Sequence, residues 1–132
     1  MTDAEYEAFV AKIQGYFDKW TVILGLSTWY LTYKFSRGPI PDDDDGAMNC
    51  SALWEYKSAT ICVSASKCEG LLDSRLEWYA VHEFMHALTM AIDDKNKEVL
   101  TERVVSDLTS AALRAYSAGQ EAAKKKEVAN ES

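Results

Sequence analysis

The two histidines of the chain lie four residues apart, in the pentapeptide His-Glu-Phe-Met-His at 82–86. The surrounding run is apolar on almost every helical face, so we expect a helix over 71–92 in the middle of the domain. Residues four apart lie one turn from each other on the same helix face. Leaving buried imidazole and carboxylate groups without partners costs about 1–3 kcal/mol per group. The fold must therefore give His82, Glu83 and His86 partners, either separate hydrogen-bond partners in the core or one shared ion.

A zinc ion meets this requirement. Two imidazoles on one helix face can converge on one ion at about 2.0–2.1 Å per nitrogen. The intervening Glu83 is then placed to reach a zinc-bound water, from which it takes a proton as general base and passes it to the leaving amine. The spacing His-Glu-x-x-His is typical of zinc metallopeptidases. We therefore predict Zn²⁺ as cofactor, His82 and His86 as metal ligands and Glu83 as the catalytic residue.

A catalytic zinc needs a third protein ligand, and the chain has no third histidine. Glu102 lies early on the next expected helix and is the ligand we favour. Glu98 competes, because a helical wheel places it slightly nearer the apolar stripe, although an acid at a helix start also serves the helix dipole. Asp107 is a candidate to orient a ligating histidine from behind, and a solvated helix face is the alternative for it.

The other segments predict an α+β domain with a small, mostly antiparallel sheet. Helical spacing of apolar residues alternates along the chain with the period of two that is typical of strands. Residues 1–119 are expected to form one domain, followed by a polar, poorly ordered tail at 120–132. The expected elements are a helix at 3–20 capped by Thr2 or Asp3, a strand end at Val22–Leu26, strands at 29–35, 52–56 and 59–63, the motif helix at 71–92, and a helix from about 97 to 118 that Gly119 stops.

Charge and composition exclude several classes of protein. The formal net charge of −7 argues against a nucleic-acid groove, and the one basic run, Lys124–Lys126, is typical of a solvated helix end. The longest apolar stretch, at 22–31, is too short and too polar to span a membrane. The N-terminus has no apolar signal segment. The three cysteines match no zinc-ribbon or Cys-x-x-Cys spacing and indicate reduced thiols, with one disulfide and a spare thiol as the alternative, so we predict a cytoplasmic protein.

The acidic run Asp42–Asp45 allows two interpretations. One is an exposed loop, which we favour. The other is a calcium site, although the run lacks the alternating ligands and closing glutamate of an EF-hand. An interaction module that uses this loop to bind a partner is the corresponding rival function.

Residues Val81–Leu88, together with Glu102–Val105, resemble the gluzincin metallopeptidases. The similarity is nearest to minimal single-domain members, the minigluzincins and phage-encoded metallopeptidases, and covers about 51–113. It implies a zincin-like domain in which two His and one Glu bind zinc and the motif Glu is the general base. It also implies that the strand near 59–63 lines the cleft and binds an extended peptide by strand addition. For a phage protein, the compartment would be the host cytoplasm.

Two departures from this family bear on the site. Ser106-Asp107 falls later after the ligand Glu than in the thermolysin-like pattern. The transition-state histidine of larger members has no counterpart, so Tyr79, Tyr56 or another tyrosine is left to stabilise the oxyanion. The sequence thus predicts a zinc metalloendopeptidase acting on a peptide or protein substrate. The alternative is a non-catalytic zinc-binding regulatory or interaction protein with the same fold, and the sequence does not indicate an oligomeric state.

Overall fold

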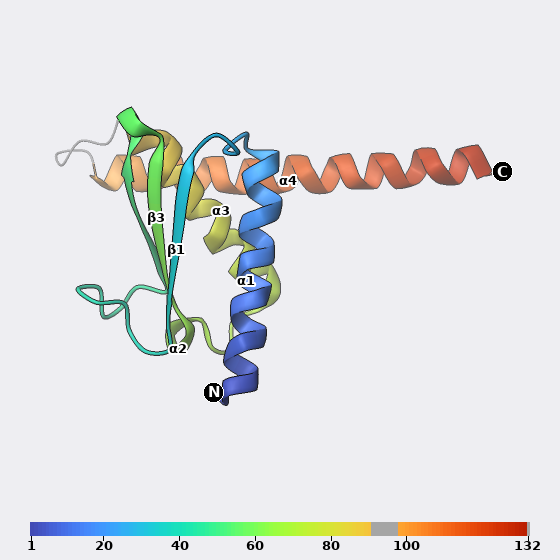
Figure 1. Cartoon of the computed structure of the whole chain (residues 1–132). Coiled ribbons are helices and arrows are strands. Elements are labelled where there is room, and N and C mark those ends of the chain that lie inside the picture. Colours follow the sequence, from blue (N-terminus) through green and yellow to red (C-terminus); the bar gives the residue numbers. More distant parts are fainter. Residues whose placement is uncertain (91–97, 132) are drawn as a thin grey trace.

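The described residues form an α+β fold with one three-stranded sheet and three long helices (Figure 1). The computed structural model describes residues 1–90 and 98–131, and for 54, 98–101 and 131 it describes the backbone alone. The elements in chain order are α1 (Asp3–Ile23), β1 (Tyr30–Ser36), β2 (Met48–Leu53), the 3-10 helix η1 (Trp54–Tyr56), β3 (Ser58–Ser64), α2 (Ala65–Cys68), α3 (Asp73–Thr89) and α4 (Glu98–Glu131).

The sheet is mixed, with strand order β1-β3-β2. β1 pairs with β3 in parallel and β2 pairs with β3 antiparallel, so the expectation of a mostly antiparallel sheet is wrong. The chain that joins β1 to β3 includes β2, and this crossover is long enough for a parallel pairing. The strand expected at 52–56 is also displaced. β2 ends at Leu53, because η1 and the left-handed Lys57 (φ 48°) form the turn into β3.

The first helix begins as predicted. Thr2 caps α1, and its side chain accepts a hydrogen bond from the backbone N–H of Glu5. The helix continues to Ile23, so the strand end expected at Val22–Leu26 is wrong. Gly25 has φ +70°, a conformation that suits glycine and turns the chain directly after the helix.

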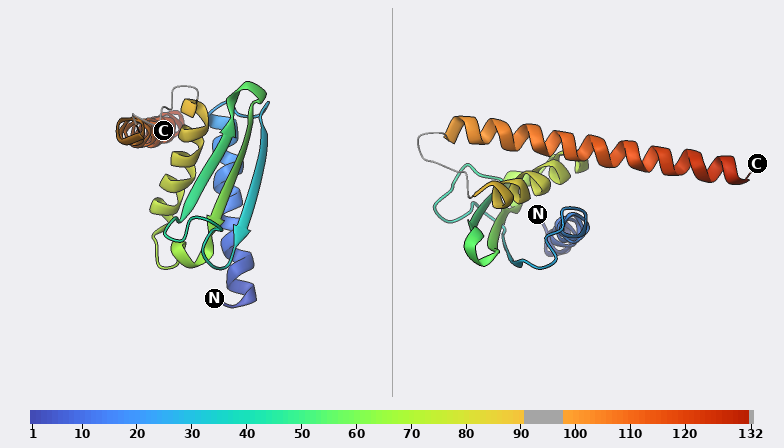
Figure 2. Two further views of the ribbon diagram at one scale, coloured as in Figure 1. Left: turned by 90° about the vertical axis from the view of Figure 1, so that its left-hand side faces the viewer. Right: turned by 90° about the horizontal axis from the view of Figure 1, so that it is seen from above.

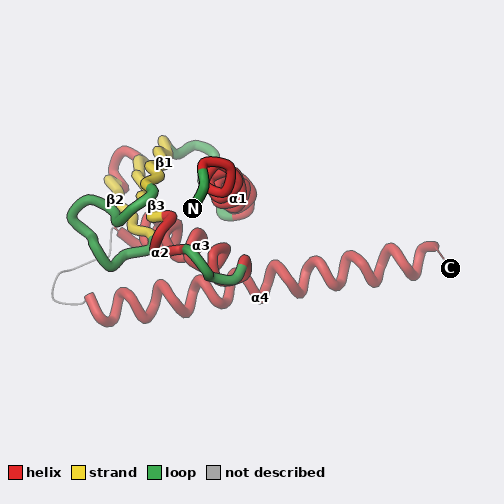
Figure 3. Tube along the Cα trace, turned by 90° about the horizontal axis from the view of Figure 1, so that it is seen from below, coloured by secondary structure: helices red, strands yellow, loops and turns green. Residues whose placement is uncertain are grey.

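The hydrophobic core lies between one face of the sheet and the helices α1 and α3, which cover the same side of it (Figures 2 and 3). Phe17 of α1 stacks on Tyr33 of β1 with ring centroids 4.4 Å apart, and it meets Phe84 of α3 edge-on at 5.6 Å. The inward residues of β3 are buried as its alternation predicted: Ala59, Ile61 and Val63. The core therefore fixes α3, with its histidine motif, against the sheet.

The last helix packs against α3 and then extends beyond the rest of the molecule (Figure 1). Gly119 does not stop it, contrary to the prediction, and the segment expected to be a poorly ordered tail is helical through Glu131. An exposed helical glycine costs only about 1 kcal/mol relative to alanine, and the helix is favoured by Ala, Leu and Arg before Gly119 and by Gln, Glu, Ala and Lys after it. None of the described helices is long and apolar enough to cross a membrane.

Candidate metal centre

Two helices bring three potential ligands together. His82 and His86 share one face of α3, and Glu102 lies near the start of α4. One ligand atom from each lies within 4.8 Å of the other two, and among the described residues this is the one group of His, Cys, Asp or Glu close enough to hold a metal ion. The structure thus joins the local motif to a residue on the next helix.

The spacing of these atoms fits a metal ion. Tetrahedral ligands at about 2.0–2.1 Å from zinc lie roughly 3.3 Å from one another. The two Nε2 atoms of His82 and His86 are 3.2 Å apart, and Nε2 of His86 is 3.1 Å from Oε2 of Glu102. Nε2 of His82 lies 2.6 Å from Oε1 of Glu102, which is closer than ligand contact requires. Two nitrogens and a carboxylate suit zinc and other first-row divalent ions, and their geometry does not identify the ion.

His82 is held in the form that binds metal. Its side chain is buried, with 6 % of the residue exposed. Burial lowers the pKa of His82, with a further lowering from His86, while the nearby Glu102 acts in the opposite direction. A neutral imidazole is the ligating form, so the fold does not have to remove a proton from His82 before metal binds.

Glu83 is a buried carboxyl group beside the three ligands. It is 5 % exposed, and burial raises its pKa to about 8, helped by the negative charges of Glu102 and Asp43. A group that titrates near neutral pH can both accept and release a proton, which is the requirement for general acid–base chemistry. Glu83, which lies between the two histidines along the chain, therefore has an unusually high pKa for a carboxyl group.

An open groove of about 640 Å³ leads to these residues. His82, Glu83, His86 and Glu102 all line it, so the group is accessible from outside. The volume is within the range of small-molecule and peptide-binding clefts. The side chain of Glu102 is 55 % exposed and those of the histidines are mostly buried, so α4 forms the solvent side of the centre.

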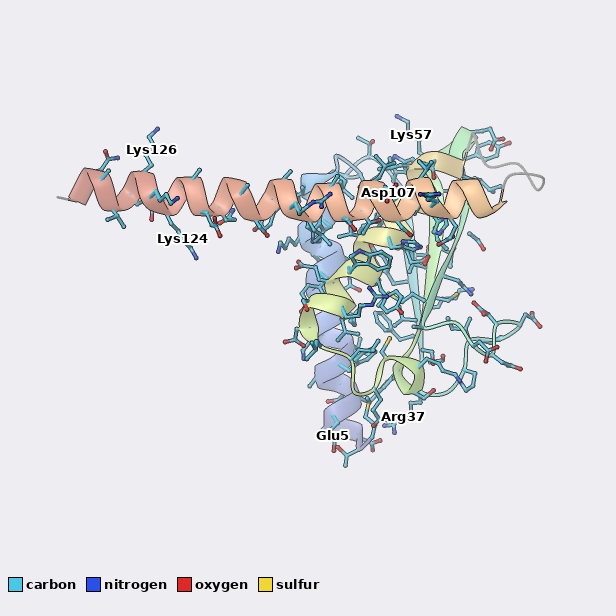
Figure 4. The ribbon with its side chains drawn as sticks, turned by 180° about the vertical axis from the view of Figure 1, so that it is seen from behind. Glu5, Arg37, Lys57, Asp107, Lys124 and Lys126 are labelled. Atoms are coloured by element: carbon cyan, nitrogen blue, oxygen red, sulfur yellow. The ribbon has the colours of Figure 1, made fainter. Side chains whose placement is uncertain are left out.

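The other residues predicted for the site separate into two groups. Tyr79 lines the groove, whereas Tyr56 does not line it and is 72 % exposed. Asp107 is exposed on α4, and none of the described histidine contacts involves it (Figure 4). Of these candidates, Tyr79 alone is placed at the groove.

The expectation that the strand at 59–63 lines the cleft is wrong. That segment is β3, which lies at the centre of the sheet with β1 and β2 on its two sides, so it has no free edge for a further strand. β2 is the strand beside the groove, which it lines with Met48, Asn49 and Cys50. Its position follows from the mixed sheet order, which the sequence pattern did not indicate.

The acidic run forms a loop at the groove. Asp45 lines the groove, and Asp43 accepts a hydrogen bond from Nδ2 of Asn49 at 3.0 Å. The four aspartates do not converge into a ligand group among the described residues, so the calcium interpretation gains no support. The acidic run affects the site electrostatically, because the negative charge of Asp43 helps to raise the pKa of Glu83.

Sequence reasoning missed three neighbours of the centre. Trp78 stacks on the ring of His82, and its spacing of four residues from His82 was an available signal. Cys50 lines the groove, and burial and the charge of Glu83 raise its pKa to about 12. Cys50 and Asp43 come from β2 and the loop before it, and no local pattern reports such contacts. Cys50, Cys62 and Cys68 are all free thiols.

No protein-family model, curated protein or solved structure matches the chain. The resemblance of 81–88 and 102–105 to the gluzincins stays a prediction. The rival ligand Glu98 lies outside the residues whose side chains are described.

Proposed function

We propose that the protein is a zinc-dependent metallopeptidase of the gluzincin type with a zincin-like fold. The observation that carries the proposal is the convergence of His82, His86 and Glu102 beside the buried Glu83 in one open groove. A structural zinc site is closed by four protein ligands, whereas a catalytic site keeps a position open for substrate. Three converging ligands at an accessible groove support the catalytic alternative.

In this proposal His82, His86 and Glu102 hold the zinc ion. When bound, zinc supplies Lewis acidity, which lowers the pKa of a water molecule to about 7 and polarises a peptide carbonyl. Glu83 takes a proton from the attacking water onto its carboxylate and then gives it to the departing amine nitrogen. With a divalent cation held by the three ligands, Glu83 would be favoured in its charged carboxylate form, because the positive charge would offset the negative charges of Glu102 and Asp43.

Tyr79 and β2 supply the proposed contacts to substrate. Tyr79 lines the groove, and its hydroxyl is the candidate donor for the oxyanion that develops on the carbonyl. β2 pairs with β3 on one side, and within the described part of the chain no strand pairs with its other edge. An extended peptide can pair with this edge through backbone hydrogen bonds, which favours a peptide or unfolded protein segment as substrate.

The test combines metal content with hydrolysis. Wild-type protein, His82→Ala and Glu83→Gln are purified, zinc is measured by mass spectrometry, and cleavage of a mixture of quenched-fluorescence peptides is followed. We expect one zinc per chain in the wild type and in Glu83→Gln, none in His82→Ala, and hydrolysis by the wild type alone. General-base removal lowers the rate by about 10²–10⁴-fold.

Two outcomes contradict the proposal in different ways. A folded wild type that takes up no zinc removes the metal site. A wild type that binds zinc but cleaves no peptide, with Glu83→Gln indistinguishable from it, favours the non-catalytic zinc-binding protein.

A further inference from the structure

The ring of Trp78 lies against the ring of His82. Trp78 is one turn earlier on α3, its ring centroid is 4.6 Å from that of His82, and the two planes are inclined by 23°. The ring of His86, one turn later on the helix, meets His82 nearly at a right angle, at 4.8 Å and 83°. Trp78 is therefore the flat surface that the His82 ring contacts.

Among the described residues, His82 has no hydrogen bond of the kind that usually orients a metal-binding histidine. Such a histidine ordinarily donates its second ring N–H to a carboxylate, a backbone carbonyl or water, and this sets the plane of the ring. Nδ1 of His82 is buried and has no hydrogen-bond partner among the described residues. Among the described residues, the contact that can fix the plane of this ring is the stacked contact with Trp78.

Trp78 is itself held from two sides. Its Nε1–H donates to Oγ of Ser110 on α4, with 3.4 Å between the two atoms. The guanidinium of Arg75 lies over the Trp78 ring, 4.6 Å from its centroid. Ser110 is on the same helix as Glu102, so one indole contacts a ligand on α3 and is bonded to the helix that carries the third ligand.

We propose that Trp78 is a positioning residue for the metal centre. The stack sets the plane of the His82 ring so that Nε2 faces Glu102 and His86, and the bond to Ser110 sets the approach of α4. This inference rests on the proposed function, since it concerns the ligands of that metal. A tryptophan that only fills space would affect the stability of the fold without affecting the metal site.

The experiment measures zinc affinity by competition with a chromophoric chelator for Trp78→Leu, Trp78→Phe and Ser110→Ala. The matched control is Trp29→Leu, because Trp29 is also a half-buried tryptophan, but it packs against the hydrophobic core and has no described ring contact with His82 or His86. Loss of an outer contact to a metal ligand lowers affinity about 10–100-fold, which we expect for Trp78→Leu. Trp78→Phe keeps an aromatic face without the N–H, so it and Ser110→Ala should lose only a few-fold, and Trp29→Leu should lose nothing.

A second readout follows the ligand geometry itself. The visible absorption of bound Co²⁺ reports the arrangement of its ligands, so we expect Trp78→Leu to shift this spectrum and Trp29→Leu to leave it unchanged. If Trp78→Leu does not fold, Trp78→Phe and Ser110→Ala carry the test through their smaller losses. The inference is overturned if folded Trp78 variants bind zinc as tightly as the wild type with an unchanged Co²⁺ spectrum. A wild type that binds no zinc instead overturns the proposed function, and the two failures are distinct.

Discussion

The two helices that carry the candidate site are held by the fold in different ways. α3 has eight buried residues, among them His82 and Glu83. In the described part of α4 the buried residues are Val105 and Thr109, although the helix is twice as long. The core therefore determines where the histidines lie, whereas a narrow contact with α3 determines where Glu102 lies. A metal ion that joins the two would stabilise the weaker contact most.

The largest effect expected from this difference is at Glu102. Removing the side chain in Glu102→Ala deletes a proposed ligand, so zinc affinity should fall by more than the roughly 10–100-fold loss typical of an outer contact. Glu98→Ala on the same helix is the matched control and should bind zinc like the wild type. Both affinities are measured by chelator competition. The reverse result, with zinc lost in Glu98→Ala and retained in Glu102→Ala, would exchange the two roles.

Metal removal should loosen α4 more than α3. Without a metal, α4 is held where it packs on α3 and where Tyr116 packs on Trp20 of α1, and within its described part only Val105 and Thr109 are buried. Local opening has a low free energy where few apolar contacts are buried. We expect chelation to speed amide hydrogen exchange at 102–110 by about tenfold or more and to change 76–85 of α3 by less than about threefold. Equal changes in both helices would show that their difference in burial does not determine their mobility.

The pH dependence of the metal-free protein should reveal the cost of burying Glu83. Its pKa rises from the ordinary value near 4.5 to about 8 on folding, so the folded state retains a proton that the unfolded chain has released. The stability due to Glu83 is therefore complete below about pH 4.5 and is lost as pH rises through 8. His82 has its pKa lowered from 6.5, which favours folding as pH rises towards that value. Above pH 6.5 the effect of Glu83 is the one that remains.

We therefore expect the free energy of unfolding of chelated protein to fall between pH 6.5 and 8, by at most about 1.4 kcal/mol per pH unit. Glu83→Gln has no proton to lose there and should show a flat profile. Saturating zinc should flatten the wild-type profile as well. Urea titrations at four pH values provide the measurement, and a chelated wild type equally stable at pH 6.5 and 8 would show that Glu83 does not retain its proton.

The sequence predicted those parts of the fold and site in which neighbours along the chain act together. The period of α1, the alternation in β1 and β3, and the His82–His86 pair are local patterns, and the structure confirms each of them. β2 was misplaced, because Trp54–Tyr56 have strand-forming side chains but are used to close a turn. The position of Cys50 in the groove and that of Asp43 near Glu83 depend on how β2 pairs. A single sequence does not indicate this pairing.

Gly119 shows a different limit of sequence reasoning. Glycine often ends helices, but here the helix has good formers on both sides and no packing that requires it to stop. The helix propensity of the residues after Gly119 thus favours continuation, whereas the packing of α4 on the rest of the protein ends near Tyr116. The docked part of the helix is determined by contact with α3, and the part beyond Tyr116 by the propensity of its residues.

The smallest expected effect is from removing that outer part. The side chains at 117–130 are exposed, and the helix projects from the body at this end, where Lys124 and Lys126 lie (Figure 4). Truncation after 117 should change the free energy of unfolding by less than about 0.5 kcal/mol and leave zinc affinity unchanged. Chemical denaturation and chelator competition measure the two quantities.

Tyr116→Ala is the control for this truncation. Tyr116 lies one residue before the last residue that the truncated protein keeps, and its substitution should lower the stability of the fold. Tyr116 packs on Trp20 with ring centroids 5.5 Å apart, and the Nζ of Lys19 lies 4.3 Å from the centre of its ring. Aromatic and cation–π contacts of this kind are each worth about 0.5–1.5 kcal/mol, so this variant should lose roughly 1–2 kcal/mol of stability. If the truncation costs as much as Tyr116→Ala, the outer helix stabilises the fold despite its exposure, and the boundary between the docked and projecting parts of α4 lies further along the chain than Tyr116.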